Sequence, residues 1–307
     1  MRSAYTNRSD LRELLPRLNP ARVVPPHKAL SAPLAQTTPP QFKLKAYGRT
    51  HVGCKRLANE DSFWLLPKHS LFIVADGMGG HAGGQIASTI SAHEMGRQTV
   101  HMLSKAEEDA RKSGNDVDLY TLLKRSTMSA CDQVTRITDA YPELESMGST
   151  LTSLLVYNDT AYLSHLGDSR AYLIRDHKLI QITEDHSYVQ ELVNFGEITP
   201  DQALVHIRRN LILKSISKNS SYMDIEPDIA AIKLRSGDRF LICSDGLIEH
   251  VRDPDILETV VTLPASKVPQ ALIEKANSSE FSSPSGIGTD NTTVVVVEIG
   301  KRRNHRK

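Results

Sequence analysis

The sequence contains no apolar run of the ~18 residues that a membrane-spanning helix requires. Its first residues also lack the apolar stretch of a secretory signal peptide, so we expect a cytoplasmic protein that is neither membrane-spanning nor exported. Cysteine is scarce: Cys54, Cys131 and Cys243 form an odd set without paired or metal-like spacing. This argues against a disulfide-stabilised or zinc-stabilised scaffold and favours a reducing compartment.

The net charge is small, +1 over 307 residues, but it is unevenly distributed. Residues 1–42 carry six Lys/Arg against two Asp/Glu, and the final segment KRRNHRK carries five basic residues and no acid. Between them, residues 43–300 hold 26 basic residues against 34 acidic ones. An acidic body argues against a nucleic-acid-binding face and leaves room for bound cations.

Proline is concentrated near the start, where seven of the 15 prolines lie between residues 16 and 40. This composition predicts that residues 1–42 form a basic, Pro-rich, disordered leader that acts as a linker or docks a partner. An Arg-rich start also resembles an organellar transit peptide, although so many prolines would break the amphipathic helix that such peptides need. We place one folded domain at 43–300 and a basic tail at 301–307.

The folded part has strands and helices in separate groups. Helical periodicity is clearest over residues 82–103 and 118–141, which follow each other directly. Short polar turns separate several of the apolar runs, as expected for antiparallel neighbours. The pattern predicts an α+β fold. The strand-like runs are LFIVAD, STLTSLLVY, TAYLSHLGD, RAYLIR, KLIQIT, DRFLICSD and TTVVVVEI.

The stretch LFIVADGMGGHAGG allows two interpretations. Gly77, Gly79 and Ala82 match the dinucleotide-binding pattern GxGxxG/A, in which a helix start holds a pyrophosphate. Asp76, in contrast, would be a hard oxygen ligand for a metal at the end of a strand. A dinucleotide domain needs alternating strands and helices and an acid at the next strand end, but Glu94 lies inside a helical stretch. We therefore favour the metal interpretation.

Carboxylates recur where apolar runs stop. Each one alone could be an ordinary turn residue, since Asp-Gly and Asp-Ser are common in turns. If the strand ends meet at one rim, however, several negative charges are crowded together and need cations to offset their repulsion. Oxygen-only ligands favour Mg²⁺ or Mn²⁺ over zinc. The four acids are Asp76, Asp168, Asp245 and Asp290.

A further polar cluster lies in GCKRLANED, residues 53–61. Arg56 offers a planar guanidinium that suits phosphate oxygens, and Glu60 and Asp61 add two acids close by. An arginine near two acids is by itself an ordinary surface ion pair. Beside a metal-binding rim, the same arginine predicts a substrate clamp.

Six segments in this order resemble the metal-dependent serine/threonine protein phosphatases of the PP2C (PPM) family, in its compact bacterial form. They are GCKRLANED, VADGMGGHAGG, MGSTLTSLLV, LGDSRAYLIR, CSDGLIEH and GTDNTTVVVVEI, and the resemblance runs from about Lys43 to Gly300. It implies two packed antiparallel β-sheets flanked by helix pairs, a four-layer αββα sandwich. The stretch near 186–215 resembles the family's flap and a following basic segment beside the site.

The resemblance implies a role for each matching metal ligand. Asp76 is similar to the carboxylate that bridges two metal ions, with the backbone carbonyl of Gly77 on one of them. Asp245 and Asp290 resemble the remaining carboxylates of the other ion. The glycines after Asp76 are then expected to allow a tight turn whose carbonyl faces the ion.

The upstream cluster is similar to the family's substrate-binding groups. Arg56 resembles the phosphate-binding arginine, and Glu60 and Asp61 resemble the acids that orient metal-bound water. Asp168, in GDSR, matches the residue that helps to hold a third metal ion in bacterial relatives. Together the resemblance implies two Mn²⁺ or Mg²⁺ ions, with a place for a third.

This chain departs from the animal members at one position. In those relatives a histidine two residues after the bridging aspartate is proposed as general acid, whereas this chain has Met78 there. His81 is close in sequence, but a loop or structural role is the simpler interpretation. The resemblance therefore leaves the general acid open.

The implied activity is hydrolysis of phosphoserine and phosphothreonine in proteins by a metal-activated water that attacks phosphorus, without a covalent enzyme intermediate. The expected partners are phosphorylated proteins, with the enzyme opposing a serine/threonine kinase. We expect a monomer with no nucleic-acid partner.

Three other functions have partial support in the sequence. A cysteine-based phosphatase needs an arginine six residues after its nucleophile, but those positions hold Glu60, Ile137 and Glu249. A GDSL-type serine hydrolase, suggested by GDSR, lacks its late DxxH pair. The alternative from another class is a catalytically inactive phosphatase-like scaffold that binds phosphoproteins, and the presence of every metal-ligating acid and of Arg56 argues against it.

Overall fold

The computed structural model describes residues 41–80, 82–218, 220, 225–278 and 287–302, all within one compact unit. The predicted leader up to residue 40, His81 and the tail from residue 303 lie outside the described residues. Strand β1 begins at Phe42, just before the predicted domain start, and β13 continues to Arg302, just past its predicted end. The division into leader, domain and tail otherwise stays a prediction.

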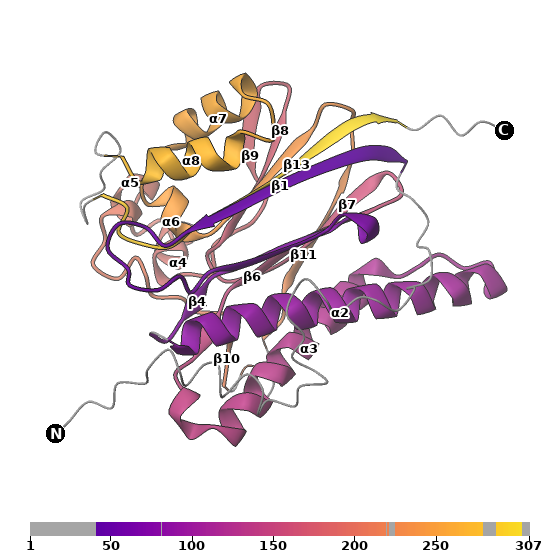
Figure 1. Ribbon diagram of the computed structural model, residues 1–307, viewed down its shortest axis with the longest axis horizontal. Helices are drawn as coiled ribbons and strands as arrows, with labels where there is room; N and C mark the ends of the chain where they lie inside the picture. The colour runs from indigo at the N-terminus through magenta and orange to yellow at the C-terminus, as the bar shows by residue number, and fades with distance from the viewer. Residues whose placement is uncertain (1–40, 81, 219, 221–224, 279–286, 303–307) are drawn as a thin grey trace. The chain divides into compact units, whose positions relative to one another are not determined.

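Two five-stranded antiparallel sheets form the centre of the fold (Figure 1). The first has the order β1-β13-β12-β8-β9 and is built from Phe42–His51, Thr292–Arg302, Arg239–Cys243, Arg170–Arg175 and Lys178–Gln181. The second has the order β11-β7-β6-β3-β2 and is built from Asp228–Lys233, Thr160–Leu166, Leu151–Tyr157, Leu71–Ala75 and Ser62–Leu66. A small third sheet, β10-β5-β4, joins Ile216–Ser217, Gly148–Ser149 and Gly77–Met78.

Helices cover the outer face of each large sheet (Figure 1). Helices α2 (Ala82–Ser113) and α3 (Leu119–Ala140) lie on the second sheet, where α2 contacts β2 and β3 and α3 contacts β7. Helices α7 (Asp253–Thr262) and α8 (Val268–Ala276) lie on the first, where α8 contacts β13 and β1. The predicted α+β, four-layer αββα sandwich is confirmed.

Shorter elements connect these layers. They are the helices α4 (Tyr188–Asn194), α5 (Pro200–Leu204) and α6 (Asp245–Ile248), and the 3-10 turns η1 (Pro67–His69) and η2 (Pro142–Leu144). Among the helices that the structure describes, none combines the length and apolar character needed to cross a membrane.

The valine run of β13 shows why the two sheets and the outer helices form one body. Val295 and Val297 belong to the core between the sheets, with Phe72 of β3 opposite them. Val294 and Val296 belong instead to the core beneath α7 and α8. All four valines are fully buried, so each stabilises the fold by roughly 1.5–3 kcal/mol of transfer free energy. A strand that is buried on both faces has apolar residues at successive positions, as the four consecutive valines of TTVVVVEI show.

Candidate metal centre

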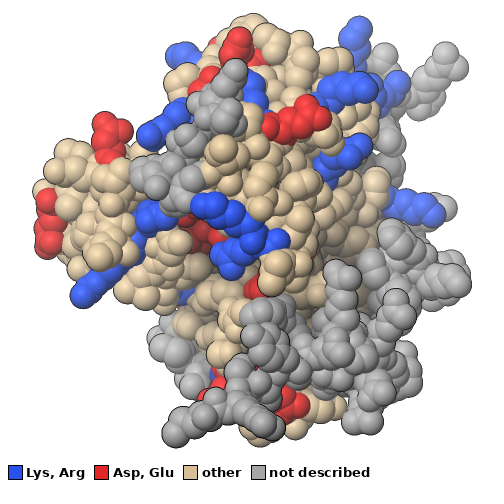
Figure 2. Space-filling view, turned by 60° about the vertical axis from the view of Figure 1, so that its left-hand side comes forward, with Lys and Arg blue, Asp and Glu red and all other residues tan. Residues whose placement is uncertain are grey.

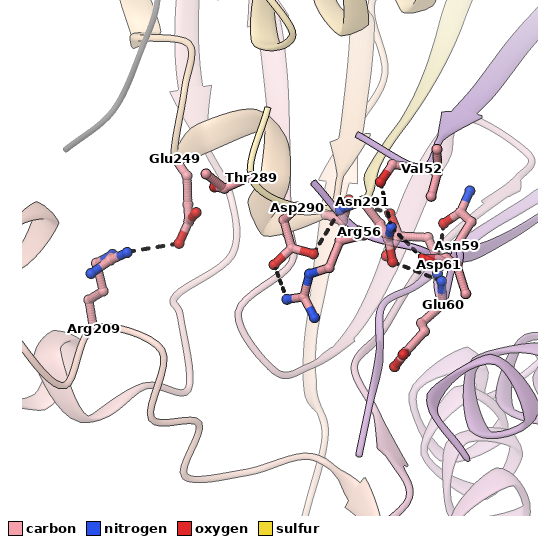
Figure 3. A network of polar contacts seen from close by, with 12 residues as sticks. Val52, Arg56, Asn59, Glu60, Asp61, Arg209, Glu249, Thr289, Asp290 and Asn291 are labelled. Atoms are coloured by element: carbon pink, nitrogen blue, oxygen red, sulfur yellow. Dashed lines mark hydrogen bonds and ion pairs between the residues drawn. The ribbon is translucent and has the colours of Figure 1, made fainter. Parts of the chain in front are cut away.

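The candidate metal ligands lie where strands of the two large sheets end. Asp61 directly precedes β2, Asp76 directly follows β3, and Asp168 lies between β7 and β8. From the other sheet, Asp245 follows β12 as the first residue of α6, and Asp290 lies just before β13. Figure 3 shows Asp61 and Asp290 in one neighbourhood although they come from opposite ends of the chain. The structure therefore brings together the strand-end acids that the sequence singled out.

Asp76 lies at the centre of this acidic group. Its carboxyl lies close enough to those of Asp61 and Asp245 for each to affect the pKa of the other. Burial, followed by the charges of Asp61 and Asp245, raises the pKa of Asp76 well above its ordinary value. Burial and the charges of Asp168 and Asp290 likewise raise the pKa of Asp245. Carboxylates that share a small volume repel one another. Protonation removes the negative charge that a bound cation would otherwise offset, which is why these pKa values are raised.

Two further acids show the same crowding. Burial raises the pKa of Asp61 to about 6, although hydrogen bonds from Thr293 and Ser244 oppose the rise. Burial, with the nearby charge of Asp185, raises the pKa of Asp168 to about 7. Neither side chain is more than 7% exposed, so water cannot screen the repulsion well.

The donor set fits a hard divalent cation. Oδ1 of Asp61 is buried and has no hydrogen-bond partner among the described residues, while Oδ2 accepts a hydrogen bond of 2.8 Å from Ser244 Oγ. No three His, Cys, Asp or Glu side chains of the described residues close around a single point, as a fully protein-ligated ion would require. Mg²⁺ and Mn²⁺ bound by a few carboxylates retain several waters, so an open set of acids fits ions of this kind.

Arg56 bonds Asp290, one of the candidate ligands (Figure 3). Its Nη2 donates a 2.6 Å hydrogen bond to Oδ2 of Asp290. The hydrogen bond to Asp290, together with the charges of Glu60 and Asp245, raises the pKa of Arg56 above its ordinary value. The arginine side chain is 50% exposed and that of Asp290 is 20% exposed, so the guanidinium faces solvent over the acids.

Asn291 holds the loop that carries Arg56 against the loop that carries Asp290. Its Oδ1 accepts the backbone N–H of Glu60 at 2.8 Å. Its Nδ2 donates to the carbonyls of Val52 at 2.9 Å and Ala58 at 3.0 Å. The sequence alone does not reveal this role, because an asparagine beside an aspartate has no distinctive signal.

The turn that carries Asp168 is held by a histidine. Gly167, whose φ is +110°, donates its N–H to Nδ1 of His186 at 3.1 Å and accepts the His186 N–H at 2.8 Å. Nε2 of His186 lies 3.2 Å from a carboxylate oxygen of Asp228. The His186 ring also stacks on His165 with a centroid distance of 4.9 Å. No sequence pattern connects these histidines with the GDSR turn.

A buried ion pair supports the same turn. Arg170 donates three hydrogen bonds of 2.7 to 3.0 Å to the carboxylate of Asp185. The two side chains are 21% and 9% exposed, so the pair is largely shielded from solvent. Bidentate arginine–carboxylate pairs fix geometry as well as charge.

The need for glycine at position 77 has a different cause from the one expected. A Cβ atom on Gly77 would lie 2.2 Å from the carbonyl oxygen of Gly84 and 2.5 Å from that of Glu60. Its backbone is not in the left-handed region, which is instead occupied by Gly79 and Gly80. Gly77 is thus required by close packing of three backbone segments, whereas the turn expected there is made by the later glycines.

The sequence profile of protein phosphatase 2C matches residues 48–272, most of the described body. The chain belongs to the protein phosphatase 2C family. It is 36% identical over 83% of its length to the serine/threonine protein phosphatase PstP of Mycobacterium tuberculosis, of which it spans 45%. It is also 32% identical over 81% of its length to the serine/threonine phosphatase stp of Listeria monocytogenes, of which it spans 94%.

A solved PP2C structure gives the same picture of the fold. The catalytic domain of PstP in complex with two manganese ions matches with a TM-score of 0.69 and 34% identity, covering 84% of this chain and 99% of that one.

The general acid stays open in this PP2C chain. Met78, two residues after Asp76, has no titratable proton. His81, the other residue considered at that place, lies outside the described residues.

The stretch near 186–215 lies beside the site of this PP2C chain. It contains α4 and α5, and Arg209 Nε lies 3.6 Å from Oε1 of Glu249, one turn after Asp245 (Figure 3). Arg208 lies over the ring of Tyr188 at 5.5 Å. Figure 2 shows Lys and Arg side chains gathered over acidic ones on this side of the molecule. Several large apolar side chains here are exposed, including Ile207 at 92% and Phe195 at 75%.

Proposed function

We propose that this chain is a Mn²⁺- or Mg²⁺-dependent protein phosphatase that hydrolyses phosphoserine and phosphothreonine. The observation that carries the proposal is the crowding of Asp76 with Asp61 and Asp245, whose charges raise its pKa, beside the ion pair of Arg56 with Asp290. Membership of the PP2C family and the two manganese ions in the PstP catalytic domain support it. PstP of Mycobacterium tuberculosis is more than twice as long as the segment that matches this chain. The activity of that longer protein is therefore a proposal for this chain.

The proposed ligands follow from these positions. Asp76 would bridge two ions with the help of the Gly77 carbonyl, and Asp245 and Asp290 would complete one of them. Glu60 and Asp61 would hold and orient coordinated water, and Asp168 would contribute to a third ion. Such ions supply a nucleophile from water near neutral pH and offset the charge of the phosphoryl group.

The side chains of this protein have separate tasks in the reaction. Arg56 would bind phosphoryl oxygens through its planar guanidinium, of which only Nη2 bonds Asp290. The Ser244 hydroxyl donates a hydrogen bond to Asp61 and accepts one from the Thr293 N–H at 2.9 Å. Both hydrogen bonds of this buried serine therefore serve to hold Asp61 in place. The thiol of Cys54 lies 3.5 Å from Asn277 Oδ1, not over the acids. These contacts agree with direct attack by water.

We propose phosphorylated proteins as substrates and a serine/threonine kinase as the opposing enzyme, with the chain acting as a monomer. The exposed arginines beside the site support a peptide substrate, since a peptide extends beyond the phosphoryl group. We also propose a reducing, cytoplasmic compartment, which suits the three cysteines, all of which are free thiols.

The test is metal-dependent turnover of p-nitrophenyl phosphate and of a phosphothreonine peptide by the purified full-length chain. We expect no turnover in excess chelator and recovery when Mn²⁺ is added back. An inactive phosphoprotein-binding scaffold would bind the peptide without releasing phosphate at any metal concentration. Full turnover in chelator would contradict the metal-dependent mechanism.

A further inference from the structure

His250 lies behind the acidic group, at the point where α6 ends. The turn Asp245–Ile248 is closed by the Glu249 N–H, which bonds the Asp245 carbonyl at 2.9 Å. The next residue is His250, which is only 4% exposed and whose N–H bonds the Leu247 carbonyl at 3.1 Å. Its ring therefore projects from the same short turn that presents Asp245.

The His250 ring contacts the loop that carries Asp290. The Thr289 N–H donates to Nε2 of His250 at 3.1 Å, and the Thr289 hydroxyl oxygen lies 3.1 Å from the same nitrogen. Thr289 is the residue directly before Asp290, and Figure 3 shows it between Asp290 and Glu249. Because a backbone N–H can only donate, Nε2 must be the unprotonated nitrogen and the ring proton must be on Nδ1.

The opposite side of the same loop is held by other groups. The Gly288 carbonyl accepts the Cys54 N–H at 2.7 Å, and Asp290 itself bonds Arg56. The loop is thus held from the Arg56 side by the 52–60 segment and from the α6 side by His250. The histidine joins the element that carries Asp245 to the loop that carries Asp290.

A role in packing alone does not explain an imidazole here. Nδ1 of His250 is buried and has no hydrogen-bond partner among the described residues. A buried donor without a partner costs roughly 1–3 kcal/mol, which an apolar side chain of similar size would avoid. Burial and the charge of Lys55 lower the pKa of His250, although the charge of Asp290 opposes this, and a neutral ring keeps Nε2 as an acceptor. The acceptor is the property that an apolar residue could not replace.

We propose that His250 is a positioning residue of the metal centre, which fixes the Thr289–Asp290 backbone relative to Asp245 and thereby sets the affinity for the divalent cation. The proposal rests on the assignment of Asp245 and Asp290 as ligands under the proposed function. Groups that orient metal ligands from behind typically change metal affinity by about 10- to 100-fold when they are removed.

The experiment compares two substitutions at this position. His250→Leu has similar bulk and no acceptor, whereas His250→Gln can place an amide oxygen near the position of Nε2. Direct binding of Mn²⁺ to each full-length variant is measured by titration calorimetry, without substrate. We expect His250→Leu to weaken Mn²⁺ binding by about tenfold or more and His250→Gln to stay within about threefold of wild type. At saturating Mn²⁺, kcat of the leucine variant should largely recover.

His69→Leu is the matched control, because His69 also has a buried Nδ1 without a partner among the described residues but lies in η1, beyond the far end of β2. It should leave Mn²⁺ binding unchanged. Equal losses of Tm in His250→Leu and His250→Gln with unchanged Mn²⁺ binding would overturn the proposal and make His250 a core residue.

If His250→Leu does not fold, His250→Asn takes its place, because its shorter amide cannot reach Thr289. Asparagine should then weaken Mn²⁺ binding where glutamine does not, and equal binding by the two would overturn the proposal. Failure of the wild-type chain to bind Mn²⁺ at all would contradict the proposed function itself, before any variant is compared.

Discussion

Nη2 of Arg56 donates a 2.6 Å hydrogen bond to Oδ2 of Asp290, so the proposed phosphate-binding cation and a proposed metal ligand form one ion pair. In the absence of a cation, the guanidinium neutralises the carboxylate. A divalent ion and a phosphate together would replace both halves of this pair, the ion at Asp290 and the phosphate at Arg56. Under the proposed function, metal binding and substrate binding would be linked through these two side chains.

Substitution of Arg56 separates the two functions. Arg56→Ala should lower kcat/KM by roughly 30- to 1,000-fold, because it removes about 2–4 kcal/mol of transition-state stabilisation. Mn²⁺ binding should become slightly tighter, by up to about fivefold, because Asp290 loses a competing partner in a half-exposed ion pair. Arg56→Lys should restore only part of the activity, since an ammonium cannot bind two oxygens at once. Unchanged kinetics in both variants would return Arg56 to an ordinary surface ion pair.

Asp76→Asn should have opposite effects with and without metal. In chelator, Tm should rise, because the substitution removes the repulsion of the buried Asp76 carboxyl by the charges of Asp61 and Asp245. With Mn²⁺, the variant should lose most of the metal-induced rise in Tm, and kcat should fall by more than about tenfold, or ~1.4 kcal/mol. Asp116→Asn, at an exposed position before α3, is the control. Retention of more than about a tenth of kcat at saturating metal would contradict the bridging role.

The stability of the metal-free protein should fall as the pH rises. Burial raises the pKa of Asp61 to about 6 and that of Asp168 to about 7, from 3.8, so folding takes up protons over this range. Their contribution is complete below the unfolded value and is lost as the pH passes through the folded values. In chelator, Tm should therefore drop by roughly 3 °C or more between about pH 5 and pH 8.

The pH effect needs a control, because buried histidines act in the opposite direction. Burial lowers the pKa of His165 to about 3, so its contribution is lost when the pH falls below the ordinary value of 6.5. Asp168→Asn isolates one carboxyl: its Tm should drop less with rising pH than that of the wild-type chain. Parallel Tm curves, measured by scanning calorimetry in chelator, would show that Asp168 does not titrate in this range.

Arg208 and Arg209 should affect peptide substrates more than small ones. Both belong to the stretch near 186–215, and Arg209 is paired with Glu249 beside the acids. Substituting both with alanine should lower kcat/KM for a phosphopeptide by about tenfold relative to p-nitrophenyl phosphate, since only the peptide extends past the metal centre. Arg235→Ala, at a 66% exposed side chain paired with Asp176, is the control. An equal loss for both substrates would place these arginines in the catalytic machinery.

Local sequence patterns determined the elements that are buried on a regular period. The helix expected over 118–141 is α3, Leu119–Ala140, and the run TTVVVVEI forms the first eight residues of β13. The helix expected over 82–103 continues to Ser113, because its last turns are polar and partly exposed and so carry little apolar periodicity. Strand β11 is not predicted by such a pattern, because it is an edge strand whose sequence, DIAAIK, is half-exposed and begins and ends with a charge.

The sequence by itself also identified the acids of the candidate site, since an aspartate at the end of an apolar run is visible in one dimension and the order of the motifs resembles one family. Only the tertiary structure decided how they meet: Asp61 and Asp76 come from one sheet and Asp245 and Asp290 from the other, and the packing of the two sheets brings them together. The groups that hold these acids in place, Asn291, His186 and His250, were not found from the sequence. Each is a single polar residue whose partner is a backbone group distant in the chain, and a hydrogen bond of that kind leaves no periodic pattern because it depends on where the fold places its acceptor and donor.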